Sequence, residues 1–162
     1  MATWELLASD KLTSAGDALD SGTFDQKDFL YVQVHRIVTG GNLDNEYMRF
    51  NGVSATDYSQ RWALNGASFS SNTGLTGIII NAQNADQSGY CVAYISNQAD
   101  QEKIATFVDC RTGGTAISNS PNRQETYGKY VDATNPITSI QLANGGSGDY
   151  DTDSELVVWG IA

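Results

Sequence analysis

The sequence is poor in the features that mark helical, membrane-spanning or nucleic-acid-binding proteins. Only 17% of its 162 residues are charged, which disfavours helices rich in Glu and Lys. Basic residues number 9 against 19 acidic ones, and a formal net charge of −10 repels a phosphate backbone, so nucleic acid is not expected as a partner. No long apolar run and no apolar leader occur, so no membrane contact is expected. We expect a soluble product made in a cytoplasm.

Cysteine is scarce, and the two residues present, Cys91 and Cys110, are not expected to pair. If segments 89–97 and 102–110 form a hairpin, Cys91 lies opposite Val108 and the two sulfurs share one face diagonally. Their Cα atoms would be about 7 to 8 Å apart, at or beyond the reach of a disulfide. We predict two reduced, half-buried thiols, as in an intracellular protein. A two-residue change of register would permit a bridge.

What the chain does contain is short alternating segments separated by turn residues, which predict an all-β fold. In segment 28–39 apolar residues alternate with polar or aromatic ones, as on a strand with one buried and one wetter face. Asn51-Gly52 and Asn65-Gly66 are turn signals. The pattern predicts a single domain over residues 1–162, a jelly-roll-like antiparallel β-sandwich of about 8–10 strands with under about 10% helix. The expected strands are 3–8, 28–39, 46–51, 58–64, 76–83, 89–97, 102–110, 125–132, 137–143 and 154–161.

No catalytic, cofactor-binding or metal-binding residue is predicted. His35 is the only histidine, and its place on a strand favours a partly exposed surface residue over a catalytic base or a metal ligand. The sequence lacks a nucleophile elbow, a phosphate-binding glycine loop and paired Cys/His spacing. We therefore expect a protein that is not an enzyme.

One acidic series, Asp149, Asp151 and Asp153, places carboxylates at alternate positions, as a calcium-binding loop does. The series departs from that pattern because Ser154 stands where a glycine is required and no glutamate closes the loop. A solvated hairpin loop is favoured over a weak cation site.

The segments around Asn51-Gly52 carry the remaining candidates. Phe50, Asn51, Gly52 and Tyr58 are predicted to form a tight structural turn with Phe50 in the core. Arg49 and Arg61 lie within expected strands, and a charged side chain inside a strand of a sandwich needs a partner. One interpretation pairs these arginines with carboxylates or carbonyls at a sheet edge, and the other places them in a subunit interface. The interface candidates are Arg49, Arg61 and Trp62.

Five segments together resemble small β-sandwich structural proteins of tailed bacteriophages, including capsid decoration or cement proteins. The segments are Met48-Arg-Phe-Asn-Gly52, Tyr58-Ser-Gln-Arg-Trp62, Trp4-Glu-Leu-Leu7, Ile137 to Leu142 and Ser154 to Ile161. The resemblance implies a decoration protein on the virion exterior that binds the major capsid protein, stabilises the shell and forms a homotrimer. Abundant tyrosine and tryptophan leave an alternative open, a receptor- or glycan-binding module of a tail fibre or spike.

Overall fold

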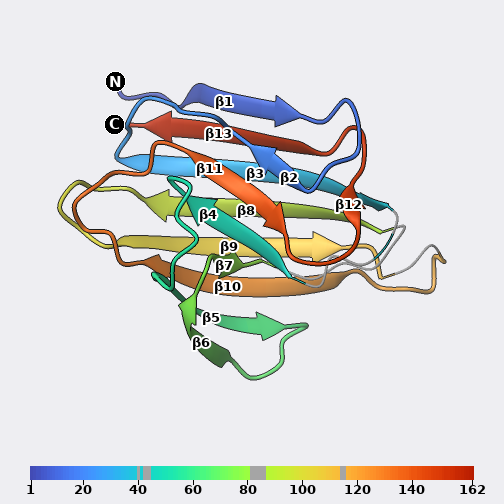
Figure 1. The fold of residues 1–162 in the computed structure, drawn as a ribbon. Coiled ribbons are helices and arrows are strands. Elements are labelled where there is room, and N and C mark those ends of the chain that lie inside the picture. Colours follow the sequence, from blue (N-terminus) through green and yellow to red (C-terminus); the bar gives the residue numbers. More distant parts are fainter. Residues whose placement is uncertain (40, 42–44, 81–86, 114–115) are drawn as a thin grey trace.

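Two antiparallel sheets of unequal size pack face to face in the computed structural model, which describes residues 1–39, 41, 45–80, 87–113 and 116–162 (Figure 1). The large sheet has nine strands in the order β1-β13-β3-β8-β9-β10-β5-β6, with β12 paired to β3, and the small sheet has the order β2-β11-β4-β7. The large-sheet strands are β1 (Glu5–Lys11), β3 (Phe29–Thr39), β5 (Tyr58–Leu64), β6 (Ser70–Leu75), β8 (Ser88–Ser96), β9 (Lys103–Arg111), β10 (Asn122–Tyr130), β12 (Asp149–Tyr150) and β13 (Glu155–Ile161). Those of the small sheet are β2 (Ala18–Asp20), β4 (Glu46–Phe50), β7 (Ile78–Ile79) and β11 (Ile140–Asn144).

The predicted antiparallel β-sandwich is confirmed, and the described residues contain no helix. Three strands that the sequence did not predict, β2, β6 and β12, bring the number to 13 in the described part of the chain. Residues 81–83 of the strand expected over 76–83 lie outside the described residues. The outermost pairs of the large sheet are both irregular, because the register shifts between Leu6 and Ala8 in β1 and between Tyr58 and Ser59 in β5.

The core fills the space between the sheets. On the large sheet it takes every second residue of β3, beginning with Leu30, Val32 and Val34, and of β8, β9 and β13. Buried residues of the small sheet, such as Met48 and Leu142, complete it from the opposite side. Burial of this one apolar cluster is what holds the two sheets together.

The Asn51-Gly52 turn passes the chain from the small sheet to the large one. Both residues have positive φ, 53° and 68°, and Phe50 before them is fully buried. The Tyr58 hydroxyl accepts a hydrogen bond from the Phe50 N–H at 2.9 Å and donates one to the Val53 carbonyl at 3.0 Å. Desolvation raises the pKa of Tyr58 to about 12, so this phenol stays neutral and able to donate. Tyr58 therefore fixes the start of β5 to the end of β4.

Replacing Gly52 with valine should lower the free energy of unfolding by about 1 kcal/mol or more. A β-branched residue is strained at a φ of 68°, even though a Cβ at Gly52 would meet no atom within 4 Å. Gly16→Val is the matched control, because Gly16 also has open space but no positive φ. Thermal denaturation of both variants measures the difference, and equal midpoints would show that backbone strain at Gly52 is unimportant.

The predicted cysteine geometry is wrong, although the absence of a disulfide is confirmed. Cys91 pairs with Asp109 rather than with Val108, so the register differs from the prediction by one residue. An odd shift places the two sulfurs on opposite faces of the sheet. Cys91 is fully buried, whereas Cys110 is exposed on the outer face, so neither is half-buried as predicted.

A charged group of three side chains lies inside the sandwich. Arg36 of β3 is fully buried between Glu46 of the small sheet, at 3.1 Å, and Asp109 of β9, with which it also forms an ion pair. Burial disfavours the charge on Arg36, but the two carboxylates outweigh this effect and raise the pKa of its guanidinium. Desolvation, opposed by Arg36, raises the pKa of Glu46 to about 7. One guanidinium thus pairs with two buried carboxyl groups, and Glu46 tends to keep its proton near neutral pH.

Candidate functional site

The three interface candidates from the sequence lie on three different surfaces. Arg49 is on the outer face of the small sheet, where its Nε donates to the Thr76 carbonyl at 3.0 Å and its guanidinium lies 5.3 Å from the centre of the Tyr47 ring. Arg61 is exposed on the outer face of β5. Trp62 is half-buried on the inner face and donates to Asn72 Oδ1 at 3.0 Å. The structure does not bring these residues together, and their role in an interface stays a prediction.

Neither His35 nor the acidic series forms a reactive or metal-binding cluster with its neighbours. His35 is exposed on the outer face of β3. Asp153 forms an ion pair with Lys11 at 2.8 Å, and within the described ranges no three His, Cys, Asp or Glu side chains are grouped to hold a metal ion. Over the same ranges there is no helix able to cross a membrane.

The outer face of the large sheet carries an unusual number of exposed apolar side chains. They come from the start of the chain and from the central strands β3, β8, β9 and β10, and most are between 41% and 57% exposed. We call this surface the aromatic face. Its members are Trp4, Phe29, Tyr90, Tyr94, Ile104, Val108 and Tyr127. Because the small sheet covers the opposite side, no described segment packs over this face (Figure 1).

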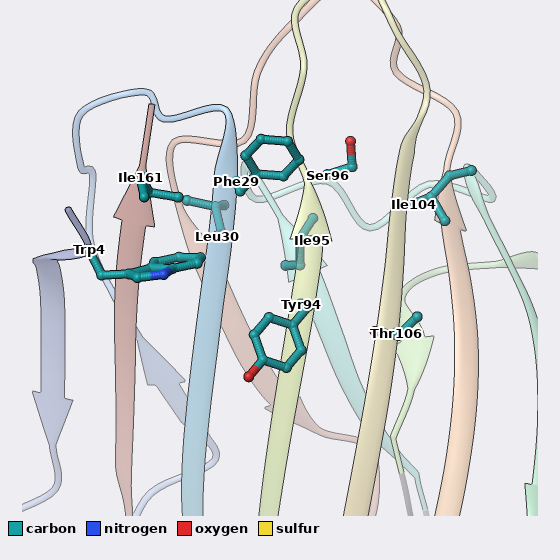
Figure 2. A pocket seen from close by; sticks show the side chains of 9 residues that line it. All are labelled: Trp4, Phe29, Leu30, Tyr94, Ile95, Ser96, Ile104, Thr106 and Ile161. Carbon is teal, nitrogen blue, oxygen red and sulfur yellow. The ribbon is translucent and has the colours of Figure 1, made fainter. Parts of the chain in front are cut away.

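At one end of the aromatic face the side chains surround a shallow hollow of about 350 Å³ (Figure 2). Tyr94 stacks on Tyr31, with ring centres 4.8 Å apart and planes 24° from parallel. Trp4 meets Tyr31 edge to face at 6.3 Å. Phe29 and Ile104 border the hollow on either side of β8. Ring pairs of this kind hold one another in place, so the apolar surface is preorganised.

A short hydrogen-bonded chain fixes the neighbouring part of the face. Trp159 Nε1 donates to Gln33 Oε1 at 3.2 Å, and Gln33 Nε2 donates to the Tyr90 hydroxyl at 2.9 Å. Partial burial and the adjacent Tyr90 raise the pKa of Tyr31, so this phenol is neutral at physiological pH. The polar side chains of this part of the face, Gln33, Tyr90 and Tyr31, are therefore uncharged.

Sequence reasoning missed the aromatic face because β9 is apolar on both sides. Ile104 and Val108 face solvent, while Phe107 faces the core together with Lys103 and Asp109. The buried ion pair of Asp109 with Arg36 and the two bonds from Lys103 Nζ to loop carbonyls, at 2.9 and 2.6 Å, satisfy the charges that face inward. These partners come from other segments, so alternation within β9 did not reveal which side is buried.

The aromatic face is large enough to be an interaction surface. The four strands that carry its members, β3, β8, β9 and β10, are 9 to 11 residues long. With strands about 4.8 Å apart and a rise of about 3.3 Å per residue, it covers on the order of 600 Å². One side of a standard protein interface is about 800 Å². The dimensions fit a docking surface for a macromolecule.

Comparison with known proteins assigns no family. No family model matches the chain, and no curated protein matches it. Among solved structures, the Emp47p carbohydrate recognition domain is similar over 97% of this chain and 88% of its own, with 11% identity and a TM-score of 0.32. A family two carbohydrate esterase from Cellvibrio japonicus has 9% identity and a TM-score of 0.21, over 99% of this chain and 34% of the esterase. Infectious bursal disease virus gives 13% identity and a TM-score of 0.12, over 99% of this chain and 42% of the viral chain. TM-scores this low assign neither a fold nor a function.

Proposed function

We propose that this protein is a non-enzymatic decoration protein of a tailed-phage capsid, and that the aromatic face is the surface that adheres to the major capsid protein. The observation that carries the proposal is the exposure of Tyr94, Ile104 and Val108, each more than half exposed, at the centre of a sheet. The sequence resemblance to decoration proteins supplies the kind of partner. Adhesion over a broad contact would bridge neighbouring capsid subunits and strengthen the shell against the packaged genome.

Charge supports the outer rather than the inner surface of a capsid. A net charge of −10 disfavours contact with packaged DNA. The seven members of the aromatic face are uncharged, and charged side chains such as Arg61, which lies opposite Tyr127, surround it on the same side of the sheet. Because the members themselves are uncharged, binding should weaken only modestly when salt is raised.

Tyr94→Asp should weaken capsid binding at least about tenfold, because a carboxylate would be buried at the centre of the contact. Purified protein is mixed with capsids that lack it, sedimented, and imaged by cryo-electron microscopy. Ile117→Asp is the control, since it adds the same charge at an exposed apolar residue in the loop between β9 and β10. Regular density between capsid subunits with wild-type protein, lost only with Tyr94→Asp, is the expected result.

Two other outcomes would contradict the capsid contact. The resemblance also implies a homotrimer, and if Tyr94→Asp dissociates free trimers in light scattering, the aromatic face is a subunit interface instead. Retention of the protein on host cells or glycans without capsid binding would favour the second candidate, a receptor- or glycan-binding module of a tail fibre or spike.

A further inference from the structure

A second, chemically different hollow lies on the inner face of the large sheet, at the end where the small sheet stops. β7, the edge strand of the small sheet, has only two residues, and among the described residues the small sheet does not extend beyond it over β5, β6 and β10. The result is a cleft of about 280 Å³. We call it the amide cleft, after the side chains that dominate it: Asn45, Gln60, Trp62, Asn72, Arg111 and Gln124.

Inward-facing residues change character where the cover ends. On β5, Tyr58 is buried in the core, whereas Gln60 and Trp62 on the same side of the strand line the cleft. On β10, Tyr130 is in the core and Gln124 lines the cleft. Within one face of the sheet, aromatic core residues thus give way to amides. This change equips the cleft for a polar ligand.

The two glutamines are fixed at one end and free at the other. Gln60 Oε1 accepts from the Ile79 N–H at 2.7 Å, and Gln124 Nε2 donates to the Ile79 carbonyl at 3.3 Å and to Thr126 Oγ1 at 3.0 Å. Gln60 Nε2 and Gln124 Oε1 make no hydrogen bond with the described residues, and neither is among the fully buried unpaired atoms, so both are open to the cleft although the two residues are only 6% and 5% exposed. A free donor beside a free acceptor suits a ligand that offers both acceptors and donors.

The other walls of the cleft contribute the flat indole ring of Trp62 and the positive charge of Arg111. The bond from Trp62 Nε1 to Asn72 Oδ1 fixes the indole ring and leaves Asn72 Nδ2 as a further donor. Arg111 has no ion pair with any described side chain, and its buried Nε has no partner. Partial burial lowers the pKa of Arg111 but leaves it a cation at neutral pH. It is the one charged side chain that lines the cleft within the described ranges.

We propose that the amide cleft binds a single saccharide unit that carries a carboxylate, such as a uronic acid. The amides offer donors and an acceptor for ring hydroxyls, the indole offers an apolar surface for the C–H side of the ring, and Arg111 pairs with the carboxylate. The volume is just below the range of about 300–1,000 Å³ typical of small-molecule sites, which fits one sugar ring. The cleft and the aromatic face lie on opposite sides of the large sheet, so this proposal is independent of capsid adhesion.

The test measures binding of glucuronate, galacturonate, glucose and galactose by saturation-transfer NMR. Uronates should bind in the millimolar range or tighter and more strongly than the neutral sugars. Arg111→Gln should weaken uronate binding about tenfold or more, because a charge-assisted hydrogen-bonded pair is lost. Asn72→Ala, on the exposed edge strand β6, is a second variant that leaves the core intact. Arg61→Gln is the matched control, since it removes the same charge from the outer face of β5.

Three results would overturn the proposal. They are no saturable binding of any of the four sugars, equal binding of neutral sugars and uronates with no effect of Arg111→Gln, and uronate binding that neither cleft variant changes. Capsid sedimentation with the same variants separates the two proposals, because the cleft variants should bind capsids as the wild type does.

Discussion

Arg36→Met should lower the free energy of unfolding by about 3–5 kcal/mol at pH 7, the largest loss expected for any single change proposed for this protein. The substitution roughly keeps the volume of the side chain but removes the guanidinium that forms ion pairs with both Glu46 and Asp109, which are at most 1% exposed. Asp109 would then be a buried carboxylate without its counterion, beside a Glu46 that keeps its proton. Urea unfolding followed by tryptophan fluorescence measures the loss.

Arg61→Met is the control for this experiment, because Arg61 is exposed and its replacement should change stability by no more than about 0.5 kcal/mol. Replacing all three members of the buried group with apolar residues of similar size should recover much of the loss, since no ion then remains desolvated. A loss below about 1 kcal/mol for Arg36→Met alone would show that water reaches the group.

Glu46 should make the protein less stable as the pH rises from about 4.5 to about 7. Its pKa is raised from 4.5 to about 7 in the folded state, chiefly by desolvation, so between these values the folded protein holds a proton that the unfolded chain has lost. Stability therefore falls with rising pH across this window and is unaffected by Glu46 above it. The contribution is on the order of 3 kcal/mol.

Glu46→Gln should abolish this slope and, at pH 8, make the protein more stable than the wild type by at least about 1 kcal/mol. At pH 5 the two proteins should differ little, because Glu46 is then protonated. Urea unfolding at several pH values provides the comparison, with Glu102→Gln as the control on an exposed residue. Parallel curves for Glu46→Gln and the wild type would mean that Glu46 is ionised throughout, held by Arg36.

The class of fold was predictable from the sequence because its signals are local. Strict alternation in β3 and the Asn51-Gly52 turn each depend on neighbouring residues only. β6 was missed because Ser70–Leu75 has almost no apolar side chain, so no local pattern marks it as a strand. It forms a strand because β5 offers it a pairing partner. Propensity is a weak guide where pairing decides.

Both candidate sites depend on contacts between distant segments, and the sequence did not reveal them. The inward orientation of Asp109 on β9 is consistent with its ion pair with Arg36, which reaches it from β3 and is also paired with Glu46. The amide cleft lies beside the two-residue strand β7, whose Ile79 backbone is hydrogen-bonded to Gln60 from β5. Of the predicted interface residues, only Trp62 belongs to either hollow, and it lies in the amide cleft rather than on the aromatic face.

The irregular register at both ends of the large sheet limits how copies of this protein can associate. β1 and β6 are the outermost strands, and bulges beside them at Leu6/Ala8 and Tyr58/Ser59 distort the rows of N–H and C=O groups that another strand would need. Lateral growth into a continuous sheet is therefore disfavoured, while the broad aromatic face stays open. A second copy is not expected to extend the sheet at either edge, and an association through the aromatic face would stack against the sheet rather than lengthen it.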